Sequence, residues 1–259
     1  MSQSQPSLFS LAGKSAVVTG SHRGIGFAMA RQMGLAGARV VISTNEAEGC
    51  EAATKALVAE GIEATGVVCD VGRDEDLDRL VREAEDAHGP IDILVCNAGI
   101  NPHFGSLTEA TDDEYDAIMR INLRSTMQLC NRVIPDMAAR RDGVVILTSS
   151  LSGLRGNGKI GVYALSKAAV AQLARNYAVE FGPQNVRANA ISPGLIDTEF
   201  ARPIMGNPAI LGPRLQKTPL RRAGTPDEIA GAAVFLASPA GAFVTGQNLV
   251  VDGGTLISD

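Results

Sequence analysis

Short apolar runs alternate with helix-like stretches along the 259-residue chain. The runs are rich in β-branched residues and mostly continuous, as in parallel strands that are covered on both faces. They predict seven strands, at 15–19, 39–43, 64–69, 91–96, 143–148, 186–191 and 247–251. The stretches between them predict helices at 25–36, 47–60, 75–88, 112–139, 162–181 and 226–237. This alternation predicts an α/β fold with one doubly wound, mostly parallel seven-stranded sheet and helices on both faces.

Two of the predicted helices begin with a recognisable cap. Thr111 precedes Glu114 by three residues, which is the spacing of a capping box. Thr225 and Glu228 repeat the spacing, and the proline between them suits the first turn of a helix. Pro135 lies within the fourth predicted helix and is expected to kink or end it.

No linker, repeat or low-complexity tract divides the chain, so residues 1–259 are expected to form one domain with an N-terminal tail at 1–11. Residues 194–219 break the alternation, because they contain several prolines and match no strand or helix. Long loops inside compact domains are usually functional or mobile. We therefore expect residues from about 195 to 219 to form a lid over the substrate.

Charge and cysteine content exclude several classes of function. The net charge of −5 argues against a surface built for nucleic acid or for an anionic membrane. The N-terminus lacks the pattern of a signal peptide, and no apolar run approaches the roughly 20 residues of a membrane span. The four cysteines lie far apart, which predicts neither a metal site nor a disulfide framework, and indicates free thiols in a reducing cytoplasm. They are Cys50, Cys69, Cys96 and Cys130.

A glycine-rich turn follows the first predicted strand and leads directly into a helix. Glycines there permit a tight turn and let the backbone approach a pyrophosphate, while the helix N-terminus supplies free N–H groups. Three glycines alone often serve packing only, but the strand–turn–helix context favours a dinucleotide site. The residues expected to form it are Gly20, Ser21, His22, Arg23, Gly24, Ile25 and Gly26.

A tyrosine and a lysine share one face of the predicted helix at 162–181. Tyr163 and Lys167 are four residues apart, so both side chains can enter one pocket. A free tyrosine has a pKa of about 10, and we expect the lysine ammonium, helped by an oxidised nicotinamide, to lower it. Ser149, Ser150 and Ser152 follow the fifth predicted strand, and a hydroxyl there can stabilise charge on a substrate carbonyl oxygen.

With its GxxxGxG turn and these later motifs, the chain resembles the short-chain dehydrogenase/reductase family over residues 12–254. The resemblance implies a Rossmann-type fold and three further groups of cofactor contacts. It assigns the adenine to Asp70 and Val71. It assigns the sheet edge beside the cofactor to Asn97, Ala98 and Gly99. It assigns the nicotinamide carboxamide to Pro193, Gly194, Ile196 and Thr198.

The same resemblance implies the chemistry. Ser150, thirteen residues before Tyr163, matches the catalytic serine of the family, although its neighbours Ser149 and Ser152 offer the same hydroxyl. Asn122 resembles the residue that holds a water near the lysine. The implied catalytic tetrad is Asn122, Ser150, Tyr163 and Lys167. It predicts an NAD(P)-dependent enzyme that interconverts a secondary alcohol and a ketone, as carbonyl reductases and 3-oxoacyl reductases do, with Tyr163 as the acid–base.

Cofactor preference depends on charge near the adenosine ribose. An acidic residue at the end of the second strand would bind the 2′-hydroxyl and repel a 2′-phosphate. That position is occupied by Thr44 and Asn45, and Glu46 is the first carboxylate after them. Arg23, beside His22 in the glycine turn, can pair with a 2′-phosphate. The sequence therefore favours NADP(H) over NAD(H), although neither Thr44 nor Asn45 is the arginine that many NADP-preferring relatives carry.

The substrate is expected to be a small alcohol or ketone. Its predicted contacts mix apolar and small polar groups, with His103 at the rim: His103, Ser150, Ser152, Tyr163 and Leu195. The long fourth and fifth helices resemble those that build family dimers and tetramers, which predicts a homotetramer. Enoyl-reductase relatives place Tyr and Lys seven residues apart rather than four, and epimerase relatives have a larger substrate domain. A non-catalytic cofactor-sensing or partner-binding protein on the same fold is the alternative.

Overall fold

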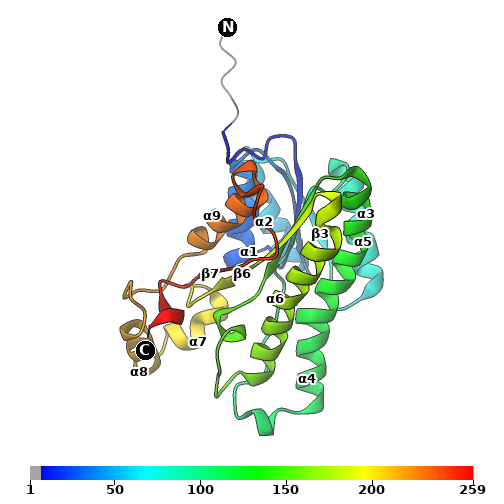
Figure 1. Ribbon diagram of the computed structural model, residues 1–259. Coiled ribbons are helices and arrows are strands. Elements are labelled where there is room, and N and C mark those ends of the chain that lie inside the picture. Colours follow the sequence, from blue (N-terminus) through cyan, green and yellow to red (C-terminus); the bar gives the residue numbers. More distant parts are fainter. Residues whose placement is uncertain (1–6, 259) are drawn as a thin grey trace.

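A single sheet of seven parallel strands forms the centre of the molecule (Figure 1). The computed structural model describes residues 7–258. The strands occur in the order β3-β2-β1-β4-β5-β6-β7, and every neighbouring pair is parallel. They are β1 (Ser15–Thr19), β2 (Arg39–Thr44), β3 (Ala64–Val68), β4 (Ile93–Cys96), β5 (Gly143–Thr148), β6 (Val186–Pro193) and β7 (Asn248–Val251). The predicted doubly wound α/β fold is confirmed.

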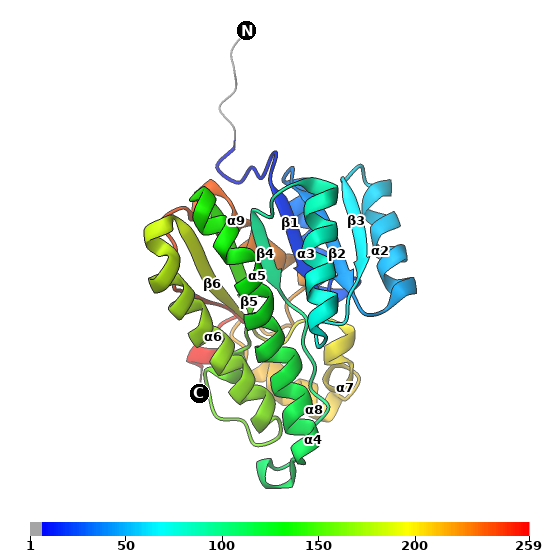
Figure 2. The ribbon, with the colours of Figure 1, turned by 90° about the vertical axis from the view of Figure 1, so that its right-hand side faces the viewer.

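Helices cover both faces of this sheet. They are α1 (Gly24–Leu35), α2 (Ala47–Ala59), α3 (Asp74–His88), α4 (Asp112–Met119), α5 (Ser125–Arg140), α6 (Gly161–Phe181), α7 (Arg202–Met205), α8 (Pro208–Gln216) and α9 (Pro226–Ala237). One buried core lies between the sheet and α1, α2 and α9, and the other between the sheet and α3, α5 and α6. Figure 2 shows α3, α5 and α6 together in front of the strands.

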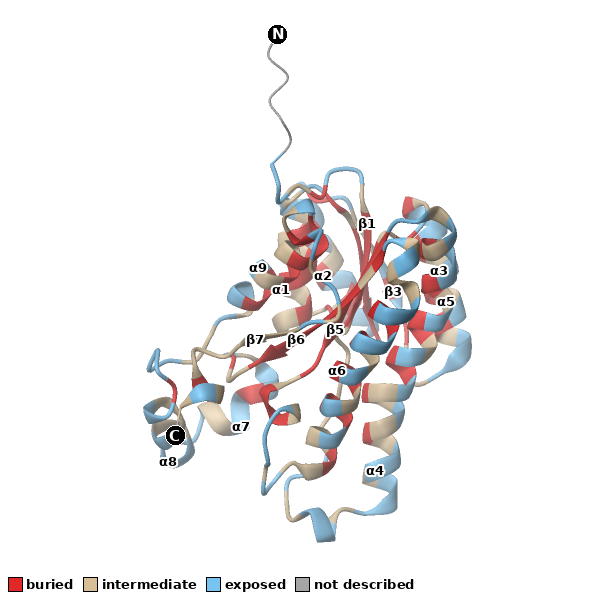
Figure 3. Ribbon diagram, viewed as in Figure 1, coloured by how far each residue is buried: buried red, intermediate tan, exposed pale blue. Residues whose placement is uncertain are grey.

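The central strands are continuous apolar runs because both of their faces are buried, as Figure 3 shows. Successive side chains point to opposite faces of a strand. Val18 of β1 therefore packs into the first core, whereas its neighbour Val17 packs into the second. The expected caps are also confirmed: Thr111 and Thr225 both form capping boxes at the starts of α4 and α9.

The long helix predicted at 112–139 is wrong in one respect. Between α4 and α5 the chain forms a π-helical turn, Arg120–Arg124, which holds one residue more than an α-helical turn can. Pro135, which was expected to kink or end this helix, lies inside α5, and α5 continues to Arg140. The helix ends where Arg141 takes a left-handed conformation with φ of 55°.

The segment at 194–219 is not the irregular loop that its prolines predict. It contains a 3₁₀ turn, Glu199–Ala201, followed by α7 and α8. Pro203 and Pro208 lie in the first turns of these two helices, where a proline is tolerated because its missing N–H would have no partner there. We call residues 195–219 the lid. Its role as a cover for the substrate stays a prediction.

The predicted N-terminal tail at 1–11 is attached to the molecule over its described part. Leu11 is buried, and its N–H donates to the Ala36 carbonyl. The Leu8 carbonyl accepts a hydrogen bond from Ala240 N. Residues 1–6 of the tail lie outside the described residues. Within residues 7–258, no helix has both the length and the apolar character needed to cross a membrane.

Candidate active site

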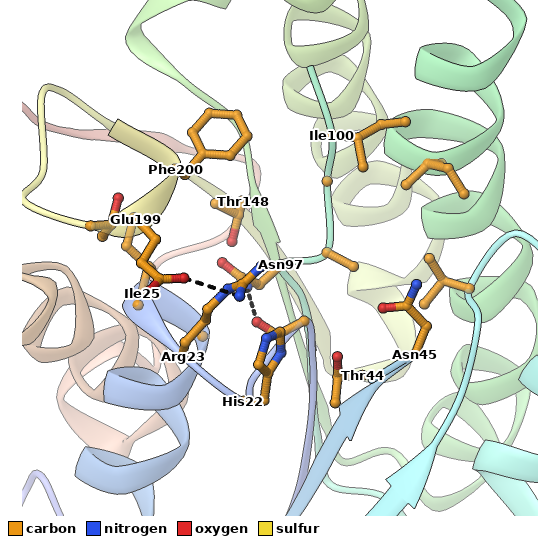
Figure 4. A pocket seen from close by; sticks show the side chains of 18 of the residues that line it. His22, Arg23, Ile25, Thr44, Asn45, Asn97, Ile100, Thr148, Glu199 and Phe200 are labelled. Carbon is orange, nitrogen blue, oxygen red and sulfur yellow. Dashed lines mark hydrogen bonds and ion pairs between the residues drawn. The ribbon is translucent and has the colours of Figure 1, made fainter. Parts of the chain in front are cut away.

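A cavity of about 640 Å³ opens at the carboxyl ends of the central strands (Figure 4). This is the place where doubly wound sheets bind their ligands, because the connections diverge there. Sixteen of the residues predicted for the site line it: Gly20, His22, Arg23, Gly24, Ile25, Gly26, Thr44, Asn45, Asp70, Val71, Asn97, Ala98, Gly99, Tyr163, Lys167 and Thr198. The structure thus brings the glycine turn and the Tyr–Lys pair to one hollow.

The turn after β1 has no room for side chains at two of its glycines. Gly20 has φ of +61°, and a Cβ there would lie 2.8 Å from the Ala98 Cα. A Cβ on Gly26 would lie against the Gly20 carbonyl and 2.5 Å from Asn97 Nδ2. Asn97 fixes the turn, because its Nδ2 donates to the carbonyls of Thr19 at 3.1 Å and Gly20 at 3.0 Å.

The geometry of this turn fits the pyrophosphate of a dinucleotide. The first residues of α1, Gly24, Ile25 and Gly26, line the cavity, and no side chain caps the helix there. The first N–H groups of a helix have no partners within it and can bind an anion. A buried polar atom on the same cavity wall is also without a partner: the Thr148 hydroxyl, at the end of β5, has no hydrogen bond within the described residues. A polar group bound in the cavity can satisfy it.

Lys167 is buried and faces the end of a strand. Its Nζ donates to the Thr148 carbonyl at 2.7 Å and lies 5.6 Å from the centre of the Tyr163 ring. Burial lowers the pKa of Lys167 to about 8. The Ser149 hydroxyl donates to the Lys167 carbonyl at 2.7 Å, which fastens α6 to the end of β5. Ser149 is therefore engaged in holding the helix.

Tyr163 departs from expectation. Burial raises the pKa of Tyr163 to about 12, and the nearby Ser150 hydroxyl only partly opposes this. The sequence predicted that Lys167 lowers this pKa. That expectation is wrong for the chain without its cofactor, because the lysine ammonium is bonded to the Thr148 carbonyl and desolvation of the phenolate dominates. Ser150 itself caps a short 3₁₀ turn, Leu151–Gly153, by accepting from Ser152 N at 3.1 Å.

Asn122 lies in the π-helical turn, and its side chain holds the segment that follows β4. Its Oδ1 accepts from Ile100 N at 2.8 Å, and its Nδ2 donates to the Ile100 carbonyl and to Ser166 Oγ, both at 3.0 Å. A Cβ on Gly99 would lie 3.3 Å from both Asn122 Oδ1 and Lys167 Nζ. The amide and the ammonium therefore flank the same glycine.

Nine of the predicted site residues do not line the cavity: Ser21, His103, Asn122, Ser150, Ser152, Pro193, Gly194, Leu195 and Ile196. Ser21 is buried and donates to the Val18 carbonyl. Leu195 and Ile196 line a separate hollow of about 90 Å³. His103 is buried, with Nδ1 3.1 Å from Glu114 Oε2 and Nε2 3.0 Å from the Ser106 carbonyl.

Three residues of the predicted lid also line the cavity, namely Glu199, Phe200 and Arg202. Sequence reasoning did not assign five further lining residues to the site: Glu46, Cys69, Ile100, Ile121 and Thr148. The position of Thr148 as the last residue of β5 is a signal that could have found it, since strand ends form the site. Phe200, whose ring centre lies 6.1 Å from that of Tyr163, lies in the predicted lid, but no motif singles it out there.

Arg23 is engaged by two carboxylates. Its guanidinium lies 3.3 Å from Glu46 Oε1 and 3.0 Å from Glu199 Oε2. Figure 4 shows Arg23 reaching toward Glu199 across the cavity wall. The Nε2 of His22 lies 3.4 Å from the same Glu46 oxygen, and burial lowers the His22 pKa from its ordinary value.

Comparison with known proteins identifies the family. A family model described as enoyl-(acyl carrier protein) reductase matches residues 20–255. Dehydrogenase/reductase SDR family member 4 of Oryctolagus cuniculus is 41% identical over 244 residues, which cover 94% of each chain. The chain belongs to the short-chain dehydrogenase/reductase family. The human member 4 is 39% identical over 245 residues, which cover 95% of this chain and 88% of that protein.

Solved structures of the family superpose closely. A gluconate 5-dehydrogenase from Burkholderia cenocepacia, in complex with NADP and tartrate, is 35% identical with a TM-score of 0.92 over 97% of this chain and 98% of that one. A 7α-hydroxysteroid dehydrogenase complexed with NADH and 7-oxo glycochenodeoxycholic acid is 35% identical with a TM-score of 0.91, over 95% of each chain. The chain is therefore an oxidoreductase of the short-chain dehydrogenase/reductase family.

Proposed function

We propose that this oxidoreductase interconverts a secondary alcohol and a ketone with a nicotinamide dinucleotide, and that Tyr163 is its acid–base. One observation carries the proposal: Tyr163 and Lys167 line the same cavity as the glycine turn and the N-terminus of α1. Tyr163 and Lys167 suit proton transfer, and the glycine turn with the N-terminus of α1 suits a pyrophosphate. The dehydrogenases that superpose on the chain, one complexed with NADP and one with NADH, support it.

Lining the cavity supports these residues as the ones that would hold the cofactor. Gly20 and Gly26 would let the backbone approach the pyrophosphate, and the family resemblance assigns Asp70 and Val71 to the adenine and Thr198 to the nicotinamide. When bound, the cofactor supplies or accepts the hydride. The chain supplies orientation and charge.

The protein's own part in the reaction is proton transfer. In reduction, Ser150 and Tyr163 donate hydrogen bonds to the carbonyl oxygen, and Tyr163 gives it the proton. Its raised pKa keeps the hydroxyl protonated for this role. Lys167, whose pKa of about 8 lies near neutrality, can return a proton to Tyr163 with the help of water held near Asn122.

The substrate class rests on the spacing of the Tyr–Lys pair and on the similar proteins. The two dehydrogenases described above are named for a gluconate and a hydroxysteroid, which supports an alcohol/ketone pair here. The 3-oxoacyl thioesters rest on the family resemblance alone. The family model's description favours a second candidate, reduction of an enoyl thioester. Tyr163 and Lys167 are four residues apart on α6, unlike the seven of enoyl-reductase relatives, and this supports the first candidate.

Cofactor preference, assembly and location belong to the same proposal. NADP(H) is favoured if a 2′-phosphate can displace the carboxylates of Glu46 and Glu199 from Arg23. A homotetramer is supported by exposed apolar side chains on α5 and α6, such as Met127, Leu165 and Val179, and light scattering would measure it. The four cysteines are free and buried, which supports a reducing compartment such as the cytoplasm.

The test is a cofactor titration followed by a substrate panel. Purified protein is titrated with NADPH and with NADH by nicotinamide fluorescence, and then assayed with ketones, 3-oxoacyl thioesters and enoyl thioesters. We expect saturable binding and substrate-dependent oxidation with the first two classes. Turnover of enoyl thioesters alone would favour the second candidate. Cofactor binding without any turnover, by the wild type and by Tyr163→Phe alike, would instead favour a cofactor sensor, and absence of binding would overturn the proposal.

A further inference from the structure

One ion-pair cluster joins three parts of the chain at the mouth of the cofactor cavity. Arg23 precedes α1 in the glycine turn, Glu46 follows the end of β2, and Glu199 begins the first turn of the lid. All three line the cavity, and each side chain is about half exposed. The Arg23 guanidinium contacts both carboxylates at once, at 3.3 Å and 3.0 Å. The lid is therefore tied to the glycine turn through one side chain.

Arg23 is shared between two partners in this cluster. Two carboxylates face its one guanidinium, and Glu199 also contacts Arg202 at 3.2 Å. Burial lowers the pKa of the neighbouring His22. A cofactor without a 2′-phosphate can leave Arg23 with its two partners. A 2′-phosphate is an anion that also pairs with a guanidinium, so it competes with each carboxylate that Arg23 contacts.

We propose that Glu199 is a specificity-determining residue that competes with the 2′-phosphate of the cofactor for Arg23. The inference rests on the proposed cofactor site. NADP(H) then releases the lid from the glycine turn, whereas NAD(H) leaves the two tied. Glu199 thereby lowers the affinity for NADP(H) and leaves the affinity for NAD(H) unchanged. It lies 176 residues from Arg23 in the sequence and outside the cofactor motifs.

Release of the lid from the glycine turn also affects the surroundings of Tyr163. Phe200 follows Glu199 in the same 3₁₀ turn, and its ring centre lies 6.1 Å from that of Tyr163. Inside the lid, Glu199 also contacts Arg202 at 3.2 Å. When Arg23 leaves, Glu199 keeps only this partner, so the turn that carries Phe200 loses its ion pair with the glycine turn.

The first experiment measures the dissociation constants of NADPH and NADH by fluorescence. Glu199→Gln is expected to bind NADPH about threefold more tightly, the scale of an exposed ion pair, and to bind NADH as the wild type does. Arg202→Gln is the matched control, because it removes the other partner of Glu199 and should not tighten NADPH binding. In an Arg23→Gln background, Glu199→Gln should have no effect.

The second experiment measures the lid directly by trypsin cleavage after Arg214 and Lys217 at saturating cofactor. We expect the wild type to be cleaved faster with NADPH than with NADH, and the two rates to be equal in Glu199→Gln. An unchanged ratio of NADPH to NADH affinity in Glu199→Gln would overturn the inference while leaving the proposed function intact. Failure of the wild type to bind either cofactor would overturn both.

Discussion

The Nζ of Lys167 donates to the Thr148 carbonyl at 2.7 Å, and so the ammonium is bonded to the end of β5 and not to the Tyr163 hydroxyl. The two side chains nevertheless share one cavity wall, with the ammonium 5.6 Å from the centre of the tyrosine ring. In the absence of cofactor, burial therefore sets both pKa values, raising that of Tyr163 and lowering that of Lys167.

Removal of the Tyr163 hydroxyl should abolish proton transfer and leave the fold intact. Tyr163→Phe is expected to lower kcat by about 10²- to 10⁴-fold, the usual contribution of an acid–base group, with little change in the Kd for the cofactor. The matched control is Tyr177→Phe on the same helix, whose hydroxyl donates to Asn131 Oδ1 at 2.9 Å. It should keep its activity and lose about 1 kcal/mol of stability. Equal activity of Tyr163→Phe and wild type would refute the role of Tyr163.

Burial of Lys167 should make the stability of the wild type rise with pH. The folded pKa of about 8 lies below the value of 10.5 for a free lysine, so between these values the unfolded chain binds more protons. The free-energy cost of burying the Lys167 ammonium is therefore fully present below pH 8 and disappears toward pH 10.5. Lys167→Met lacks this penalty, and its free energy of unfolding relative to wild type should fall by about 2 kcal/mol between pH 7 and pH 9.5.

Denaturant unfolding at these two pH values measures the difference. Both lie below the raised pKa of Tyr163, so this tyrosine stays protonated in the folded chain. The variant should also be inactive at either pH. A difference in stability that does not change with pH would show that the lysine is not charged and desolvated as described.

The space around two glycines, one in the glycine turn and one in α9, predicts opposite effects for their changes to alanine. At Gly26 the new methyl group would meet Gly20 and Asn97, so Gly26→Ala should cost about 1–3 kcal/mol and weaken cofactor binding at least tenfold. Gly231, in α9, has open space around its Cβ position. Gly231→Ala should stabilise the protein by about 0.5–1 kcal/mol without affecting the cofactor. Thermal unfolding and fluorescence titration of both variants check this, and tight cofactor binding by Gly26→Ala would contradict the proposed pyrophosphate site.

The side chain of Asn122 should matter for both stability and catalysis. Asn122→Leu removes three hydrogen bonds and leaves Ile100 N and its carbonyl unpaired, which should cost about 3 kcal/mol. Asn176→Leu, an exposed change on α6, should stay within about 0.5 kcal/mol. Because Asn122 holds the water near Lys167 in the proposed mechanism, kcat of its variant should fall while the cofactor Kd is kept. A variant with full kcat would exclude Asn122 from the proton path.

The strands and the capping boxes were predictable because their signals are local. A run such as that of β1 must be buried on both faces, and Thr225 with Glu228 closes a cap within four residues. The π-helical turn carries no local signal, since nothing in residues 120–124 distinguishes it from a regular helix. The prolines of the lid were misleading for a related reason: a proline in the first turn of a helix and one in a loop look the same in the sequence.

The site was predictable as far as its motifs extend. The glycine turn and the Tyr–Lys pair were found by spacing and Asn97 by the family resemblance, and all of them line one cavity. The partners of Arg23 were not found, because Glu199 approaches it only through the folding of the lid. The pKa of Tyr163 was misjudged because the distance between two residues on a helix says nothing of how far the site is desolvated.

The π-helical turn at Arg120–Arg124 also bears on how the chain tolerates insertion and deletion. Such a turn is a helical turn with one extra residue inserted, and the regular helix on either side of it keeps its position and packing. Deletion of a single residue from it should restore a continuous α-helix, leave α4 and α5 in place and remove only the bulge that presents Asn122. Deletion of one residue usually disrupts the packing of a buried helix. Here it is expected to abolish catalytic activity while the protein still folds.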